Sequence, residues 1–237
     1  MKINIGKIKV RGFDKDIEKV LIILYFFTGI IEITFQMYMD IYFQYFIKPV
    51  EFLLLLALYS YTSSLKNPLY FINLLFLLIG RMFFISNEIG VVRYALIFVF
   101  FHRIIEIYYV AKLTRINDYI PPTLASIPFL FYFLYLVSIP DNVMVQSYIS
   151  LIIQIVLIAA LSGIVLSNYL SANNKKDVWL LIFGIMSLTQ TFVVFIEKFY
   201  LSDLKLISLR PLALFLNSIV CFSFYKFVIN NERLNND

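Results

Sequence analysis

Charged residues are scarce in this chain, and their scarcity excludes most kinds of protein. They make up 15% of the 237 residues, whereas apolar residues make up 61%. Soluble domains contain about 25% charged and about 45–50% apolar residues. The composition therefore argues against an ordinary soluble domain and indicates a protein that faces lipid.

Cysteine and histidine are nearly absent, with Cys221 and His102 as the single examples. A disulfide needs two cysteines, and metal centres usually draw on several Cys or His side chains. The sequence also contains no phosphate-binding loop, dinucleotide fingerprint or zinc-ligand spacing. We therefore expect neither a metal centre nor a cofactor.

Long apolar stretches, separated by short polar breaks, fill most of the chain. We predict eight transmembrane helices over 20–37, 43–61, 69–85, 91–113, 119–139, 145–169, 178–196 and 206–229. Backbone amides in hydrocarbon need partners within their own segment, so these runs are expected to be helices. The predicted fold is an all-α, polytopic membrane helical bundle formed by residues 20–229, with a basic segment 1–19 before it and a polar tail 230–237 after it.

Lys and Arg gather at the ends that a cytoplasmic N-terminus would place inside, which favours an N-in/C-in topology. Residues 1–19 are polar and charged, and the first apolar run is long and lacks a small-residue cleavage site, so no cleavable signal is expected. A composition rich in Ile, Phe, Tyr, Lys and Asn suggests an AT-rich, bacterial genome. The expected location is the bacterial cytoplasmic membrane, with membrane lipids as partners and no nucleic acid.

Ionisable residues inside the predicted spans are candidate functional residues, because charge is costly in lipid. With the N-terminus inside, five of them share the outer layer of the membrane: Glu32, Lys48, Glu51, Arg81 and Arg210. Their opposite charges can neutralise one another, which lowers the cost of burial. We expect a polar cavity open to the outer face, with Gln190 of the seventh span as a weaker member.

The fourth predicted span carries three polar residues near mid-membrane. His102 and Glu106 are four residues apart and share a helix face, and Arg103 is also within reach of Glu106. A Glu–His pair is suited to general acid–base work. The alternative is a buried ion pair that joins this helix to a neighbour.

Several short motifs together resemble a known family. They are Lys48-Pro49, Gly80 in the third span, His102 followed by Tyr108 and Tyr109, Tyr148 in the sixth span, and the stretch from Phe183-Gly184 to Lys198-Phe199-Tyr200. In this order, within eight spans, they resemble the YhhN-like membrane proteins, the lysoplasmalogenase family. The resemblance implies hydrolysis of the vinyl ether bond of lysoplasmalogens, with release of an aldehyde.

The sequence departs from the family at its two acidic positions. Members carry Gly-Asp in the third helix and Ser-Asp in the seventh, whereas this chain has Arg81 after Gly80 and Gln190 in place of the second acid. The candidate catalytic residues are therefore Glu51, His102 and Glu106. The candidate substrate-binding residues are Lys48, Arg81, Glu32, Gln190 and Arg210.

Three functions remain open at this point. The first is a lysoplasmalogenase-like enzyme with rearranged acids. The second is a catalytically inactive lipid- or partner-binding membrane subunit, which Arg81 favours because a guanidinium suits a phosphate group. The third is a small transporter or proton relay that uses His102, Arg103 and Glu106.

Overall fold

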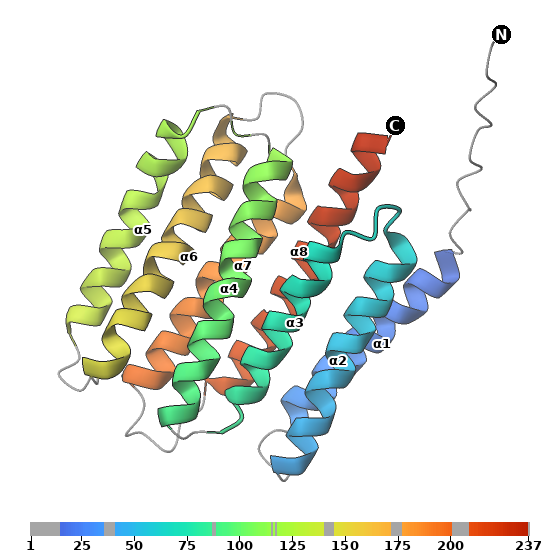
Figure 1. The fold of residues 1–237 in the computed structure, drawn as a ribbon, viewed down its shortest axis with the longest axis horizontal. Coiled ribbons are helices and arrows are strands. Elements are labelled where there is room, and N and C mark those ends of the chain that lie inside the picture. The colour runs from blue at the N-terminus through green and yellow to red at the C-terminus, as the bar shows by residue number, and fades with distance from the viewer. Residues whose placement is uncertain are drawn as a thin grey trace.

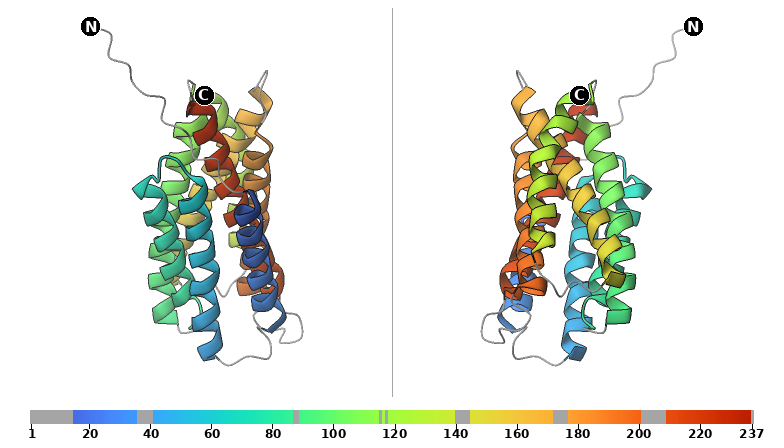
Figure 2. Two further views of the ribbon diagram at one scale, coloured as in Figure 1. Left: turned by 90° about the vertical axis from the view of Figure 1, so that its right-hand side faces the viewer. Right: turned by 90° about the vertical axis from the view of Figure 1, so that its left-hand side faces the viewer.

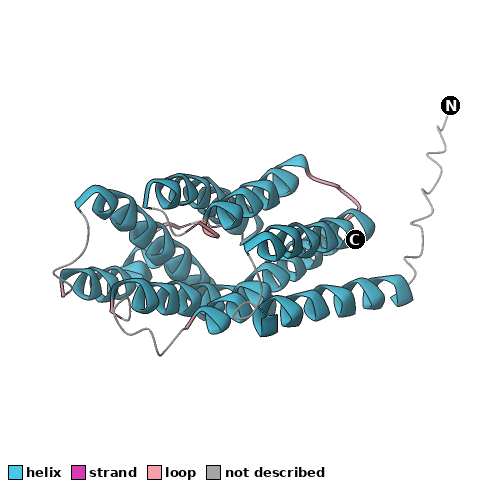
Figure 3. Ribbon diagram, turned by 90° about the horizontal axis from the view of Figure 1, so that it is seen from below, coloured by secondary structure: helices cyan, strands magenta, loops and turns pink. Residues whose placement is uncertain are grey.

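The computed structural model describes residues 15–35, 41–86, 89–114, 116, 118–139, 145–171, 177–200 and 209–236. These residues form eight α-helices and no strand (Figures 1 and 3). The helices are α1 (Lys15–Phe35), α2 (Ile41–Thr62), α3 (Pro68–Phe83), α4 (Ile89–Thr114), α5 (Ile120–Ser138), α6 (Val145–Ser171), α7 (Val178–Phe199) and α8 (Arg210–Asn236). The prediction of an all-α helical bundle is confirmed.

Helix boundaries differ from the predicted spans mainly at the two ends of the chain. Helix α1 begins at Lys15, so the end of the predicted N-terminal segment 1–19 is already helical. Helix α8 continues through Asn236, so most of the predicted polar tail is helical and Glu232 within it is buried. Hydropathy alone could not show this, because it records that these residues are polar and not that Glu232 is buried against Tyr59 of α2. The predicted start of the eighth span, at 206–208, lies outside the described residues.

Helix α8 occupies the centre of the bundle. It packs against α1, α2, α4 and α7, while the remaining helices pack mainly on their neighbours in the chain or across α4 and α6. Figure 2 shows the helices running along a common direction, with α8 in red beside α1 in blue. In an apolar window of 18 residues within the α8 span, 72% of residues are buried, against 17% in the corresponding window of the α5 span. Helix α8 is therefore positioned to contribute side chains to any internal site.

Aromatic rings hold α8 to its neighbours. Tyr59 of α2 stacks on Tyr70 of α3, with ring centroids 3.9 Å apart. Phe224 of α8 stacks on Tyr70 at 5.9 Å and packs on Phe183 of α7 at 5.0 Å. Such pairs contribute about 0.5–1.5 kcal/mol each beyond the apolar area they bury.

Two glycines mark the closest helix contacts, as expected for close-packing points between membrane helices. A Cβ at Gly163 of α6 would lie 2.4 Å from the carbonyl oxygen of Pro122 in α5. A Cβ at Gly184 of α7 would lie 2.6 Å from a methyl carbon of Val165 in α6. Helices α5 and α6 therefore approach backbone to backbone at Gly163, whereas at Gly184 the backbone of α7 packs on the side chain of Val165.

Five of the helices are long and apolar enough to cross a membrane, as an integral membrane protein requires. Within the described residues they cover Tyr42–Thr62, Ile120–Ser138, Ile149–Leu170, Val178–Glu197 and Arg210–Leu234. Helix α3 is apolar but has only 16 residues. Large apolar side chains are exposed on the peripheral helix α5, among them Leu124, Phe131 and Tyr135. Such a surface is suited to lipid rather than to water.

Candidate functional site

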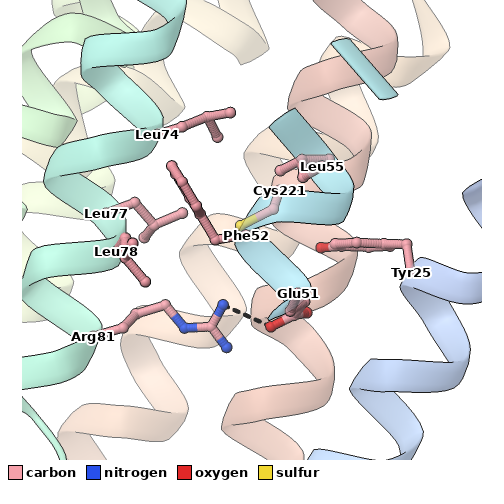
Figure 4. A pocket seen from close by; sticks show the side chains of 9 residues that line it. All are labelled: Tyr25, Glu51, Phe52, Leu55, Leu74, Leu77, Leu78, Arg81 and Cys221. Carbon is pink, nitrogen blue, oxygen red and sulfur yellow. Dashed lines mark ion pairs between the residues drawn. The ribbon is translucent and has the colours of Figure 1, made fainter. Parts of the chain in front are cut away.

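Four charged side chains from three helices meet in one cluster, which we call the four-charge cluster: Glu32 of α1, Lys48 and Glu51 of α2, and Arg81 of α3. Glu32 Oε1 forms an ion pair with Lys48 Nζ at 3.1 Å, and Glu32 Oε2 accepts from Arg81 Nη2 at 3.1 Å. The other nitrogen of the guanidinium, Arg81 Nη1, lies 2.7 Å from Glu51 Oε2 (Figure 4). The structure thus brings together four of the five charges expected in one layer.

Burial of the four-charge cluster depends on its neutrality. Glu51 is 1% exposed, and Glu32 and Lys48 are 5% exposed. Two carboxylates and two cations leave no net charge, so each desolvated group has an opposite charge at contact distance. Residues 48 and 51 are three apart in α2 and so share a helix face, which places both toward α1 and α3.

Helix α8 completes the cluster through Ser218, a residue that the sequence did not single out. Ser218 Oγ donates to Glu51 Oε1 at 2.6 Å. Tyr25 of α1 donates its hydroxyl to the carbonyl oxygen of Ser218 at 2.9 Å. A Cβ at Gly29 would lie 3.1 Å from Ser218 Oγ, so glycine at this position leaves room for the hydroxyl. The only signal in the sequence was a small polar residue within an apolar run.

A small cavity of about 10 Å³ adjoins Glu51 and Arg81 (Figure 4). Besides these two residues it is lined by Tyr25, Phe52, Leu55, Leu74, Leu77, Leu78 and Cys221. Charge lies at one end of the lining, and leucine and phenylalanine side chains form much of the rest. This volume is about that of one water probe.

Two predicted site residues have hydrogen-bond partners outside the four-charge cluster. Gln190 Nε2 donates to Asn217 Oδ1 at 3.0 Å, and this bond joins α7 to α8. Arg210 Nη2 lies 3.5 Å from the carbonyl oxygen of Phe84, just after α3. Neither residue is among those that line the cavity.

The fourth helix contributes a second polar group, separate from the cavity lining. His102 Nε2 lies 3.2 Å from Glu106 Oε1, and Arg103 Nη1 donates to Glu106 Oε2 at 2.9 Å. Both contacts follow the predicted spacing. The third partner is Asn73 of α3, which contacts His102 Nδ1 through its side-chain oxygen at 2.9 Å. The three proposed catalytic residues therefore divide between two places, since Glu51 lines the cavity and the other two do not.

A third buried carboxylate, Glu232 of α8, is held by hydroxyl groups, and we call this set the hydroxyl network: Glu232, Tyr59 and Ser63. Tyr59 donates to Oε1 at 2.8 Å and Ser63 donates to Oε2 at 2.6 Å. Next to it, the hydroxyls of Thr62 and Tyr225 lie 2.8 Å apart. Sequence reasoning missed this network because Glu232 lies in the segment interpreted as a polar tail.

Metal binding finds no support in the part of the chain that the structure describes, where no three Cys, His, Asp or Glu side chains gather. Compared with known protein families, with curated proteins and with solved structures, the chain gives no match. The resemblance to the lysoplasmalogenase family therefore depends on the sequence motifs alone.

Proposed function

We propose that the chain is an eight-span protein of the bacterial cytoplasmic membrane with both termini inside. The five helices that meet the length and apolarity requirement support this proposal. Helices α1 and α4 are of comparable length, and their charged residues Glu32, Arg103 and Glu106 have partners inside the bundle. Charges that are paired internally do not prevent a helix from crossing the membrane.

Cysteine labelling tests this topology, because the chain has one native cysteine and it is buried. In a Cys221→Ser background, we expect Ser86→Cys to react with an impermeant maleimide added outside intact cells. Lys66→Cys, at the other end of α3, should react only after the membrane is opened. Labelling of both positions from outside would contradict the proposal.

We further propose that the protein binds lyso-ether phospholipids at the four-charge cluster. The observation that carries this proposal is the cavity beside Glu51 and Arg81, which combines a guanidinium with an apolar lining. A lyso-phospholipid has the same division, with a phosphate at one end and a single apolar chain at the other. Arginine presents a planar pair of donors that matches phosphate oxygens.

Binding requires the cavity to open, because about 10 Å³ holds only a water-sized group. The ion pairs of Arg81 with Glu32 and Glu51 join α3 to α1 and α2. A phosphate that binds the Arg81 guanidinium would replace these two ion pairs and allow α2 and α3 to separate. The lipid chain would then lie along Leu55, Leu74 and Leu78.

Hydrolysis of the vinyl ether bond is the second candidate function, and Glu51 favours it. Among the described residues that line the cavity, Glu51 is the one carboxylate. When a phosphate occupies Arg81, the Glu51 carboxylate is released from its ion pair and takes up a proton. The protonated carboxyl gives this proton to the β-carbon of the enol ether and accepts one from the water that adds to the adjacent carbon, and the resulting hemiacetal splits into the aldehyde and the glycerol hydroxyl. His102 and Glu106 lie outside the lining and would support this chemistry only indirectly.

The experiment uses purified protein in nanodiscs with a 1-alkenyl lysophosphatidylethanolamine as probe, and it measures both binding and release of fatty aldehyde. We expect saturable binding that weakens about tenfold, or about 1.4 kcal/mol, in Arg81→Lys. This variant keeps the charge and loses the planar fork. Lys112→Gln is the matched control, because Lys112 lies near the other end of the bundle in the last turn of α4.

Aldehyde release separates the two candidates. Release by the native protein that disappears in Glu51→Gln, with binding retained, supports hydrolysis. Binding without release supports the inactive, lipid-binding function. Equal binding by the native protein, Arg81→Lys and Lys112→Gln would overturn the assignment of the site.

A further inference from the structure

The carboxylate of Glu32 in α1 lies between two cations that belong to two other helices. Its Oε1 lies 3.1 Å from Lys48 Nζ of α2, and its Oε2 accepts from Arg81 Nη2 of α3 at 3.1 Å. The residue is 5% exposed. Two oxygens on one central atom thus bridge an ammonium and a guanidinium. The two free oxygens of a phosphodiester could bridge the same two cations in the same way.

The two carboxylates of the four-charge cluster are held differently. Glu51 pairs with Arg81 and also accepts a hydrogen bond from Ser218 of α8 at 2.6 Å. Glu32 is held by its two cations, with no such hydroxyl donor among the described residues. Glu32 is therefore the carboxylate that an incoming anion would replace at both cations.

The position of Glu32 in α1 gives its side chain a way out of the cluster. It lies in the last turn of the helix, which ends at Phe35, and Phe35 and Ile30 are exposed on either side of it. Among the described helices, α1 packs on α2 and α8 alone. With the topology proposed above, this end of α1 lies at the outer surface of the membrane, where water can solvate a displaced carboxylate.

We propose that Glu32 is an internal competitor of the ligand, which occupies the place of the phosphate between Lys48 and Arg81 until a phosphodiester lipid displaces it. This inference rests on the proposed lipid binding and adds Lys48 as the second cation that holds the phosphate. A phosphodiester carries a single negative charge, as Glu32 does, so the exchange keeps the cluster neutral. Arg81 connects the two places, because it lines the cavity and also contacts Glu32.

An internal competitor predicts an effect opposite to that of an ordinary contact residue. The apparent dissociation constant is the intrinsic one divided by the fraction of the protein that is free to bind. If Glu32 occupies the two cations in about nine molecules of ten, removing its charge strengthens binding about tenfold. Loss of a residue that only contacts the ligand would weaken binding instead.

The experiment measures the dissociation constant of a 1-alkenyl lysophosphatidylethanolamine for the native protein and two variants in nanodiscs. Glu32→Gln keeps the shape of the side chain and removes its charge, and we expect binding about tenfold tighter than native. Glu18→Gln is the matched control on the same helix, because Glu18 also lies between a lysine and an arginine, Lys226 at 2.8 Å and Arg233 at 3.8 Å. Its affinity should equal that of the native protein.

Two further variants extend the test. Glu32→Asp keeps the charge on a shorter side chain that reaches the two cations less well. It should bind more tightly than native, by less than Glu32→Gln, and it replaces that variant if Glu32→Gln does not give a folded, monodisperse protein. Adding Lys48→Gln to Glu32→Gln removes the second cation without its competitor, and binding should weaken about tenfold against Glu32→Gln alone. Equal binding by these two would overturn the role of Lys48.

The outcomes separate this inference from the proposed function. Tighter binding in Glu32→Gln alone supports the competitor, even if the native protein shows no binding, which would count against lipid binding by the native protein. Native binding that Glu32→Gln leaves unchanged or weakens would overturn the competitor and leave lipid binding in place. An equal gain in Glu18→Gln would assign the effect to the net charge of α1 and overturn the competitor. No binding by any variant would overturn both.

Discussion

The four-charge cluster and the hydroxyl network both bury carboxylates, but they satisfy them with different partners. Glu51 contacts a guanidinium and a serine hydroxyl, whereas Glu232 contacts two hydroxyls and no cation among the described residues. Glu51 adjoins a cavity, and Glu232 is not among the residues that line it. The four-charge cluster is held by ion pairs together with hydrogen bonds, whereas the hydroxyl network is held by hydrogen bonds alone.

This difference determines what each region is suited to do. A cation that neutralises a carboxylate can exchange it for another anion, so the four-charge cluster is suited to receive a phosphate. Hydroxyl donors bind a carboxylate without neutralising it and offer nothing for a charged ligand to replace. The hydroxyl network is therefore a structural link between the end of α2 and the end of α8.

The largest expected loss of stability comes from removing a cation of the four-charge cluster while its carboxylates remain. Arg81→Ala leaves Glu51 buried without a cation, and breaking a buried pair in this way costs about 3–5 kcal/mol. The free energy of unfolding, measured by titration with SDS in mixed micelles, should fall by this amount. The double variant Arg81→Leu with Glu51→Leu removes both charges and should recover most of the loss. A double variant as unstable as the single one would contradict the charge-balance account.

Removing the carboxylate of the hydroxyl network should have a smaller effect. Glu232→Ala leaves the hydroxyls of Tyr59 and Ser63 without their acceptor but leaves no unpaired charge behind. We expect a loss of about 2 kcal/mol in the same SDS titration. Leu234→Ala, at an exposed position two residues further on, is the control and should change stability by less than about 0.5 kcal/mol. A loss equal to that of Arg81→Ala would remove the distinction between the two regions.

Two serines allow a matched comparison, because each donates to a buried carboxylate at 2.6 Å. Ser63→Ala should cost about 2 kcal/mol, since Glu232 then keeps only Tyr59. Ser218→Ala should cost about 1 kcal/mol, since Glu51 keeps Arg81. Thermal unfolding of the two variants in the same detergent shows which substitution lowers stability more. The reverse order would show that the cation contributes less than the hydroxyls.

The smallest expected effect concerns a carboxylate held by backbone donors. Asp177 accepts from the backbone N–H groups of Trp179 and Leu180 at the start of α7, and from Asn231 of α8. Asp177→Ala removes this N-cap and should lower stability by about 1 kcal/mol. Asp177→Ser keeps a capping oxygen and should recover at least half of the loss. An equal loss in both variants would assign the effect to the contact with Asn231 instead.

Features that depend on neighbours in the chain were predictable. Apolar length predicts the eight helices, and the spacing within 102–106 predicts the contacts of Glu106 with His102 and Arg103. The position of each ionisable residue along its helix, with the N-terminus inside, predicts that those of the first three helices share a layer. These inferences need only the rise and period of an α-helix and the cost of charge in an apolar environment.

Features that depend on how each helix is rotated against the others required the tertiary structure. The sequence does not predict the hydrogen bonds that join Ser218 to Glu51, Asn73 to His102 and Tyr59 to Glu232. The rotation of α7 likewise decides that Gln190, a candidate site residue, donates a hydrogen bond to Asn217 and does not line the cavity. Hydrophobic patterning does not specify rotation in a bundle whose helices are apolar on every side. The rotation is seen only in contacts between residues far apart in the chain, such as the hydrogen bonds above, the stacking of Tyr70 on Phe224 and the close approach of Gly163 to Pro122.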